Sequence, residues 1–145
     1  MKNEDLLNQL KQFSACEEAV TWTNGMDLKT AWNKCERADW MLWYIFMAKI
    51  GTERDRIHII CDCAATALKY VPKGEDRPRL AIEAARNYAD NPTEENKAAA
   101  NAAAYAANAT AYAANAANAA VYAAADAAAH KKMCNMIRDK IKLED

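Results

Sequence analysis

The chain has 145 residues, 52% of them hydrophobic, which predicts about one globular domain. Its 19 basic and 20 acidic residues leave a net charge of −1, so the composition argues against DNA, RNA or an anionic membrane surface as a partner. Five cysteines without disulfide-framework spacing indicate reduced thiols. With no secretory leader pattern at the start and no good membrane span, a cytoplasmic protein is expected.

The first two predicted helices are short and begin at polar residues. Asn3 is placed to cap a helix through about residue 13. Ser14 and Glu17 have the spacing of a capping box, which predicts a second helix running to Thr23, where an Asn-Gly pair ends it.

The hydrophobic centre is predicted in the helical region that Asp27 starts and Gly51 ends. Apolar and aromatic residues recur there at three- and four-residue intervals, with a bend expected near residues 36–39. Because tryptophans among aliphatic neighbours are most often core residues, Trp40 and Trp43 are interpreted mainly as packing residues. One compact core is expected in this middle part of the chain.

Two amphipathic helices are expected next, one beginning at Thr52 and the other at Asp76 with Pro78 in its first turn. A loop around Pro72 separates them. The side chains expected to face the core from the first of them are Ile57, Ile60, Cys61, Ala64, Leu68 and Val71.

An alanine-rich tract covers residues 98–129, after a helix start near Pro92. Alanine has the highest helix propensity, so the tract is predicted to be helical. One unbroken helix from 93 to 142 would be about 75 Å long, whereas a domain of this size has a radius of gyration of about 15 Å. A break is therefore expected between Asn108 and Asn118, which would give a helix pair.

No segment alternates like a β-strand, so the predicted fold class is all-α. The architecture expected is a compact multi-helix bundle of antiparallel helical hairpins with a long Ala-rich C-terminal helix pair. We expect a single domain, residues 1–145, divided into an N-terminal helical extension (1–26), core helices (27–92) and Ala-rich helices (93–145).

Several short motifs lie along this chain. They are Trp-Asn-Lys-Cys at 32–35, Ala-Asp-Trp-Met-Leu-Trp at 38–43, Cys-Asp-Cys-Ala at 61–64, Val-Pro-Lys-Gly-Glu-Asp-Arg-Pro-Arg-Leu-Ala-Ile-Glu at 71–83, and the Ala-rich tract with His130. With these motifs the chain resembles the alanine-rich immunity proteins of bacterial polymorphic toxin systems, a family also seen in phages and mobile elements. That family typically has arginines in the tract, where this chain has Asn and Tyr. The resemblance implies an all-helical domain that binds and neutralises a toxin, or a relative of such a domain in a phage or mobile element.

A first candidate site combines charged residues near the helix that begins at Asp76. Arg77, Arg79 and Glu83 either form a ligand-binding site for an anionic group, with Trp40 as a stacking platform, or cap and pair within an ordinary helix. The structural interpretation is favoured, since pairs at these spacings recur on many helices.

A second candidate is the polar stripe of the Ala-rich tract, which keeps one helical phase. Tyr and Asn are enriched in binding surfaces, although they also serve to keep an Ala-rich helix in contact with water. The residues predicted to bind a partner are Tyr105, Asn108, Tyr112, Asn115 and Tyr122.

No metal, cofactor or catalytic site is predicted. His58 with Cys61 and His130 with Cys134 lack a recognised zinc spacing, and no nucleophile elbow or phosphate loop is present. The leading hypothesis is a non-enzymatic neutraliser that occludes a toxin or host defence protein. The alternatives are a helical protein that binds or sequesters a small, nucleotide-type ligand, and a structural module that self-assembles into homo-oligomers through its alanine faces.

Overall fold

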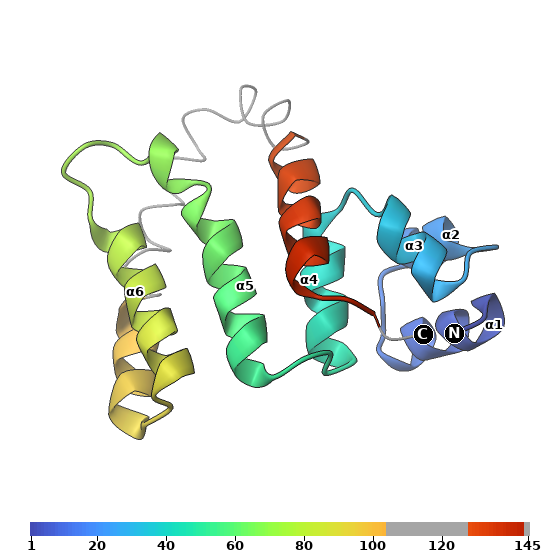
Figure 1. The fold of residues 1–145 in the computed structure, drawn as a ribbon, viewed down its shortest axis with the longest axis horizontal. Helices are drawn as coiled ribbons and strands as arrows, with labels where there is room; N and C mark the ends of the chain where they lie inside the picture. The colour runs from blue at the N-terminus through green and yellow to red at the C-terminus, as the bar shows by residue number, and fades with distance from the viewer. Residues whose placement is uncertain (104–127, 144–145) are drawn as a thin grey trace.

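The computed structural model describes residues 1–103 and 128–143, and this part of the chain contains helices and no strand (Figure 1). The predicted all-α class is confirmed. The elements are α1 (Asn3–Gln12), α2 (Glu17–Thr23), α3 (Leu28–Lys34), α4 (Ala38–Met47), α5 (Glu53–Ala65), the 3-10 turn η1 (Leu68–Tyr70), α6 (Arg77–Asp90), and two further helices over 94–103 and 128–140. We call the helix over 128–140 the C-terminal helix. The expected break between Asn108 and Asn118 lies outside the described residues.

Two of the predicted helix starts have the expected caps. The carboxylate of Asp27 accepts a hydrogen bond from the amide of Thr30 at 2.7 Å at the start of α3. At the start of α5, Thr52 and Asp55 each accept a hydrogen bond from the other's backbone amide, which completes a capping box. These local bonds explain why sequence alone located both starts.

The predictions for α1 and α2 were wrong in their caps, although not in their extents. Asn3 is the first residue of α1, and its side-chain amide donates to the carbonyls of Thr23 and Met26, 3.1 and 2.7 Å away. Ser14 has φ +59°, and α2 begins at Glu17 without a side-chain cap. The left-handed turn at Ser14 ends α1, since the amide of the following Ala15 bonds back to the carbonyl of Leu10. Ser14 is therefore used to stop one helix and not to start the next.

The expected bend near residues 36–39 is a complete break between α3 and α4. Cys35 and Arg37 both have extended backbone conformations. The C-terminal helix closes this break from outside: the guanidinium of Arg138 donates to the carbonyls of Trp32 (2.9 Å) and Cys35, and His130 Nδ1 accepts the amide of Ala38 at 3.0 Å. Backbone groups that a continuous helix would satisfy are thus satisfied by a distant segment.

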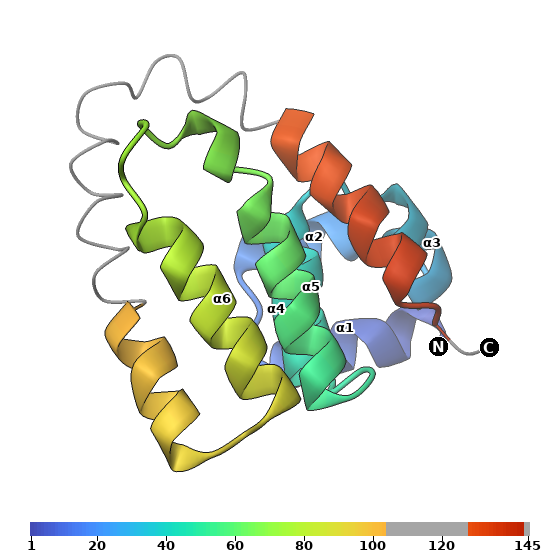
Figure 2. The ribbon, with the colours of Figure 1, turned by 60° about the vertical axis from the view of Figure 1, so that its left-hand side comes forward.

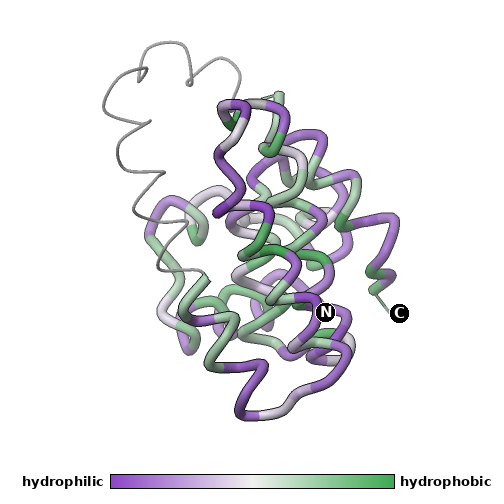
Figure 3. The backbone as a smooth tube through the Cα atoms, turned by 90° about the vertical axis from the view of Figure 1, so that its left-hand side faces the viewer, coloured by the Kyte–Doolittle hydropathy of each residue, from purple (hydrophilic) through white to green (hydrophobic). Residues whose placement is uncertain are grey.

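The helices pack side by side around one core. α5 and α6 form an antiparallel hairpin, and the C-terminal helix lies on the other side of α5, near α4 (Figures 1 and 2). Hydrophobic and hydrophilic positions alternate along the helices, as amphipathic packing requires (Figure 3). In the described part of the chain, each helix is too short or too polar to cross a membrane.

The core draws on both ends of the chain as well as its middle. Leu6 and Leu10 of α1, Ile45 of α4, and Ile137 and Ile141 near the C-terminus are all buried in it. The core expected from the sequence lay in the middle of the chain, because the large apolar residues are concentrated there. The core residues at the two ends of the chain are distant from this region in sequence. Only the tertiary packing of α1 and the C-terminal helix brings them into the same core.

The core-facing strip predicted for α5 was partly wrong. Ile60 is 39% exposed, whereas Ile59, Cys61 and Cys63 are buried. Neighbours on two sides of α5 explain the difference: Ile59 and Cys63 belong to the main core, while the thiol of Cys61 faces the carbonyl of Ile82 on α6. A helix buried on two sides has no single apolar stripe from which to read its orientation.

We predict that replacing Ile137 with Ala lowers the free energy of unfolding by about 2–5 kcal/mol, as for other large truncations at fully buried sites. Leu80→Ala is the matched control. Because Leu80 is 47% exposed, this change should lower the free energy of unfolding by less than ~1 kcal/mol. Urea denaturation followed by circular dichroism measures both. Equal effects of the two changes would contradict the packing of the C-terminal helix described above.

Candidate functional site

A cavity of about 530 Å³ lies among α1, α2, α3 and α4 and is lined mainly by apolar atoms. All four tryptophans of the chain line it: Trp22 from α2, Trp32 from α3, and Trp40 and Trp43 from α4. We call it the tryptophan cavity. Its volume falls within the range of about 300–1,000 Å³ that is common for ligand sites.

The indole rings are held at defined angles to their neighbours. The rings of Trp22 and Trp40 lie with centroids 5.8 Å apart at 58°, and Trp43 makes an edge-to-face contact with Phe13 at 6.3 Å and 77°. Trp40 and Trp43 pack against the core, as expected, and also line the cavity. They can do both because each is only partly buried.

The inner wall of the cavity is formed by the core itself. Leu6 and Leu10 from α1 and Met41 from α4 line it, and all three are buried. The hydroxyl of Tyr44 donates to the side-chain oxygen of Gln9 at 2.7 Å, and burial raises the pKa of this phenol. Since α1 supplies a wall, the N-terminal segment is part of the site.

Charged residues gather at one part of the cavity lining. Arg37 Nε and an NH2 group donate to the two carboxylate oxygens of Asp39 at 2.9 and 2.7 Å, and another NH group of Arg37 lies 3.4 Å from Glu18. The hydrogen bond from Arg37 lowers the pKa of Asp39 and keeps this carboxyl ionised. The guanidinium carbon of Arg37 also lies 4.5 Å from the centroid of the Trp40 ring. We call Glu18, Arg37 and Asp39 the charged rim.

The structure separates the residues proposed from sequence as an anion site. Trp40 lines the tryptophan cavity, whereas Arg77, Arg79 and Glu83 do not. Arg77 pairs with Glu75 at 2.6 Å, and Arg79 pairs with Glu83 at 2.6 Å. α5 stands between α4, which carries Trp40, and α6, which carries the three charged residues (Figure 1). The second predicted set, Tyr105, Asn108, Tyr112, Asn115 and Tyr122, lies outside the described residues.

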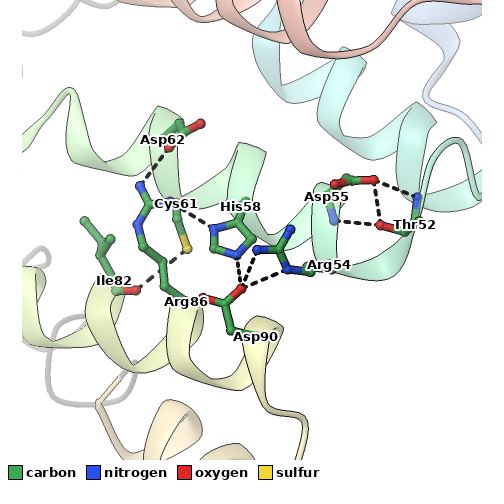
Figure 4. A network of polar contacts seen from close by, with 9 residues as sticks. All are labelled: Thr52, Arg54, Asp55, His58, Cys61, Asp62, Ile82, Arg86 and Asp90. Carbon is green, nitrogen blue, oxygen red and sulfur yellow. Dashed lines mark hydrogen bonds and ion pairs between the residues drawn. The ribbon is translucent and has the colours of Figure 1, made fainter.

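A separate polar network joins α5 and α6 (Figure 4), and Lys140 extends it to the C-terminal helix. His58 Nε2 lies 2.8 Å from Asp90, and its Nδ1 lies 3.1 Å from a guanidinium nitrogen of Arg86. Arginine can only donate, so Nδ1 must be the acceptor and Nε2 must carry the proton. The imidazole of His58 thus joins Asp90 on α6 to Arg86 of the same helix from its place on α5.

Asp62 is the other carboxylate of this network. It accepts from Arg86 at 2.8 Å and from Lys140 of the C-terminal helix. Burial opposes its ionisation, but the hydrogen bonds from Lys140 and Arg86 outweigh that effect and lower its pKa. Asp62 is therefore an ionised link between three helices.

The cysteines and histidines are distributed among several local environments. His58 contacts Asp90 and Arg86, while His130 accepts the amide of Ala38. Cys35 and Cys134 lie together in the core, where a hydrogen bond from Cys134 lowers the pKa of Cys35. Within residues 1–103 and 128–143, no three His, Cys, Asp or Glu side chains form a group that could hold a metal ion.

Sequence reasoning did not identify the tryptophan cavity as a site. The signal that could have found it is the confinement of every tryptophan to residues 22–43. Comparison of the chain with protein-family models, with curated proteins and with solved structures finds no match.

We predict that Asp62→Asn destabilises the protein at pH 7 and that its difference from wild type shrinks as the pH falls. A carboxyl whose folded pKa is lowered contributes stability above its ordinary pKa of about 3.9, and this stability is lost as the pH falls through the lowered value. Denaturant titrations between pH 7 and pH 2.5 measure the difference in unfolding free energy between wild type and variant. Asp139→Asn, at an exposed position, is the control. A difference that stays constant over this range would show that the charge of Asp62 contributes nothing.

Proposed function

We propose that this protein is a non-enzymatic binding protein that neutralises a toxin or a host defence protein in the cytoplasm by occluding it. In this proposal the tryptophan cavity receives apolar side chains of the partner. The observation that carries the proposal is that all four tryptophans line one mainly apolar cavity with charged residues at its rim. The resemblance to immunity proteins supports the same class of function.

The physical support comes from the way interface energy is distributed. Tryptophan, tyrosine and arginine provide a large share of hot-spot energy, mostly from desolvated pockets surrounded by polar groups. The tryptophan cavity has this composition, with Glu18, Arg37 and Asp39 as its polar surround. An inserted apolar side chain would contact rigid indole faces at a small cost in side-chain entropy.

The contacts of the two histidines support a role in binding over one in catalysis. Histidine is the side chain most used for proton transfer near neutral pH. His58 lies between Asp90 and Arg86, and His130 accepts a backbone amide at the α3–α4 break. Both contacts hold helices together, so neither imidazole supports a catalytic assignment.

The alternative is a small-ligand binder, which the volume of the tryptophan cavity favours. A nucleotide-type ligand has less support than an uncharged or cationic one. The arginines proposed to hold its phosphates, Arg77 and Arg79, are paired with acids outside the cavity, and the rim carries two carboxylates.

We predict that a bulky group on Cys16 blocks partner binding. Cys16 lines the cavity and is the exposed cysteine, whereas the other four are buried. Labelling with fluorescein maleimide should therefore be selective and should weaken the complex at least tenfold by filling the cavity mouth. The partner is first captured from host extracts or taken as the product of the adjacent gene, then purified, and the complex is reconstituted for calorimetric titration.

The Cys16→Ser variant, treated with the same reagent, is the matched control and should bind as tightly as the unlabelled protein. Unchanged affinity of the labelled protein for a purified partner would remove the cavity from the interface. For a small ligand, the same labelling should abolish the ligand-induced rise in melting temperature.

The polar stripe of the Ala-rich tract makes a separate prediction. If it binds the partner, changing Tyr105, Tyr112 and Tyr122 together to Ala should weaken the complex by about 1–2 kcal/mol or more per residue, while helicity is kept because alanine is the better helix former. Calorimetric titration beside a thermal melt measures both quantities. Unchanged affinity in a folded triple variant would exclude the stripe, and a loss of self-association on sedimentation would support the self-assembling alternative.

A further inference from the structure

The charges at the tryptophan cavity are not balanced. Two carboxylates, Glu18 and Asp39, and one guanidinium, Arg37, line it. Arg37 already forms ion pairs with both acids: its guanidinium nitrogens lie 2.7 and 2.9 Å from the carboxylate oxygens of Asp39 and 3.4 Å from that of Glu18. An anionic ligand would therefore meet two carboxylates and would have to compete with them for the guanidinium of Arg37. A cationic ligand would complement the net negative charge of the lining.

The ring of Trp40 already carries a cation. The guanidinium carbon of Arg37 lies 4.5 Å from its centroid, well inside the range of about 6 Å for a cation–π contact, and tryptophan is the best aromatic partner for such contacts. The ring of Trp22 stands beside it at 5.8 Å. The two carboxylates and the Trp40 ring thus surround one position, which the guanidinium of Arg37 occupies.

Arg37 is well placed to leave that position. It is the N-cap residue of α4, and its carbonyl accepts the amide of Met41, so its side chain can change rotamer while the backbone stays in place. Its side chain is 43% exposed. Its departure would leave Glu18, Asp39 and the Trp40 face available together, at the edge of an apolar cavity much larger than one guanidinium.

We propose that the mouth of the tryptophan cavity is a subsite for an organic cation, such as a quaternary ammonium or guanidinium group attached to an apolar body. Arg37 occupies the subsite in the free protein and is displaced by the ligand. This inference rests on the proposed function, because it names the chemical class that the same cavity accepts from a partner or a small molecule.

The test compares choline with its uncharged isostere 3,3-dimethylbutanol, titrated into the full chain at constant ionic strength. Tryptophan emission is the readout, because every tryptophan lines the cavity. We expect Arg37→Ala to bind choline roughly tenfold more tightly than wild type, which corresponds to the loss of one competing cation–π contact. Its affinity for the alcohol should not change.

Two further variants isolate the cause. Arg54→Ala removes the same charge from an exposed arginine that pairs with Asp90, outside the cavity, and should leave choline binding as in wild type. Adding Glu18→Gln to Arg37→Ala should remove most of the gain, since it removes one of the two rim carboxylates. The side chains of Glu18 and Arg54 are 71% and 61% exposed, so these two changes should not prevent folding.

Equal affinity of the Arg37→Ala variant for choline and for the alcohol would overturn the cation subsite and leave the cavity as an apolar receptor. An equal gain in Arg54→Ala would overturn it too, since net charge alone would then explain the effect. If neither probe changes the emission of any variant, the subsite is also overturned. The Cys16 labelling experiment, which uses no probe ligand, then tests the proposed function separately.

Discussion

The fold depends on how the C-terminal helix closes the break between α3 and α4. Arg138 satisfies two carbonyls at the end of α3, and His130 accepts the first free amide of α4, so a segment about a hundred residues away completes the polar groups of both helix ends. The same helix places Ile137 in the core and Lys140 on Asp62. Without these contacts the break would expose backbone groups next to the apolar core.

The candidate site follows from that break. α3 and α4 separate there, so their tryptophans can face α1 and α2 across a cavity and need not stack along one continuous helix. The extended backbone at Arg37 also places its guanidinium over Trp40 and beside Asp39. The charged rim and the aromatic wall are therefore consequences of one interruption in the chain, and we propose both as the basis of binding.

Local sequence predicted much of the fold and little of the site. The helix starts at Asp27 and Thr52 were predictable because a capping side chain and its amide lie three residues apart. Trp40 was considered as a ligand contact, but alongside Arg77, Arg79 and Glu83, which belong to another helix surface. Of its actual neighbours, Arg37 lies three residues away at the start of the same helix, whereas Trp22 comes to it from α2 through tertiary packing, which no local pattern records.

The sequence by itself determined that the described chain is helical and where most helices begin and end, because propensity, caps and apolar periodicity act within a few residues. It did not determine which face of α5 is buried, which distant segments complete the core, or where the tryptophans meet. Tertiary structure decided these, since they depend on contacts between residues far apart in the chain: Cys61 with Ile82, Arg138 with Trp32, and Trp22 with Trp40. The free energy of such a contact depends on both surfaces that meet, so the sequence of one segment alone does not predict it.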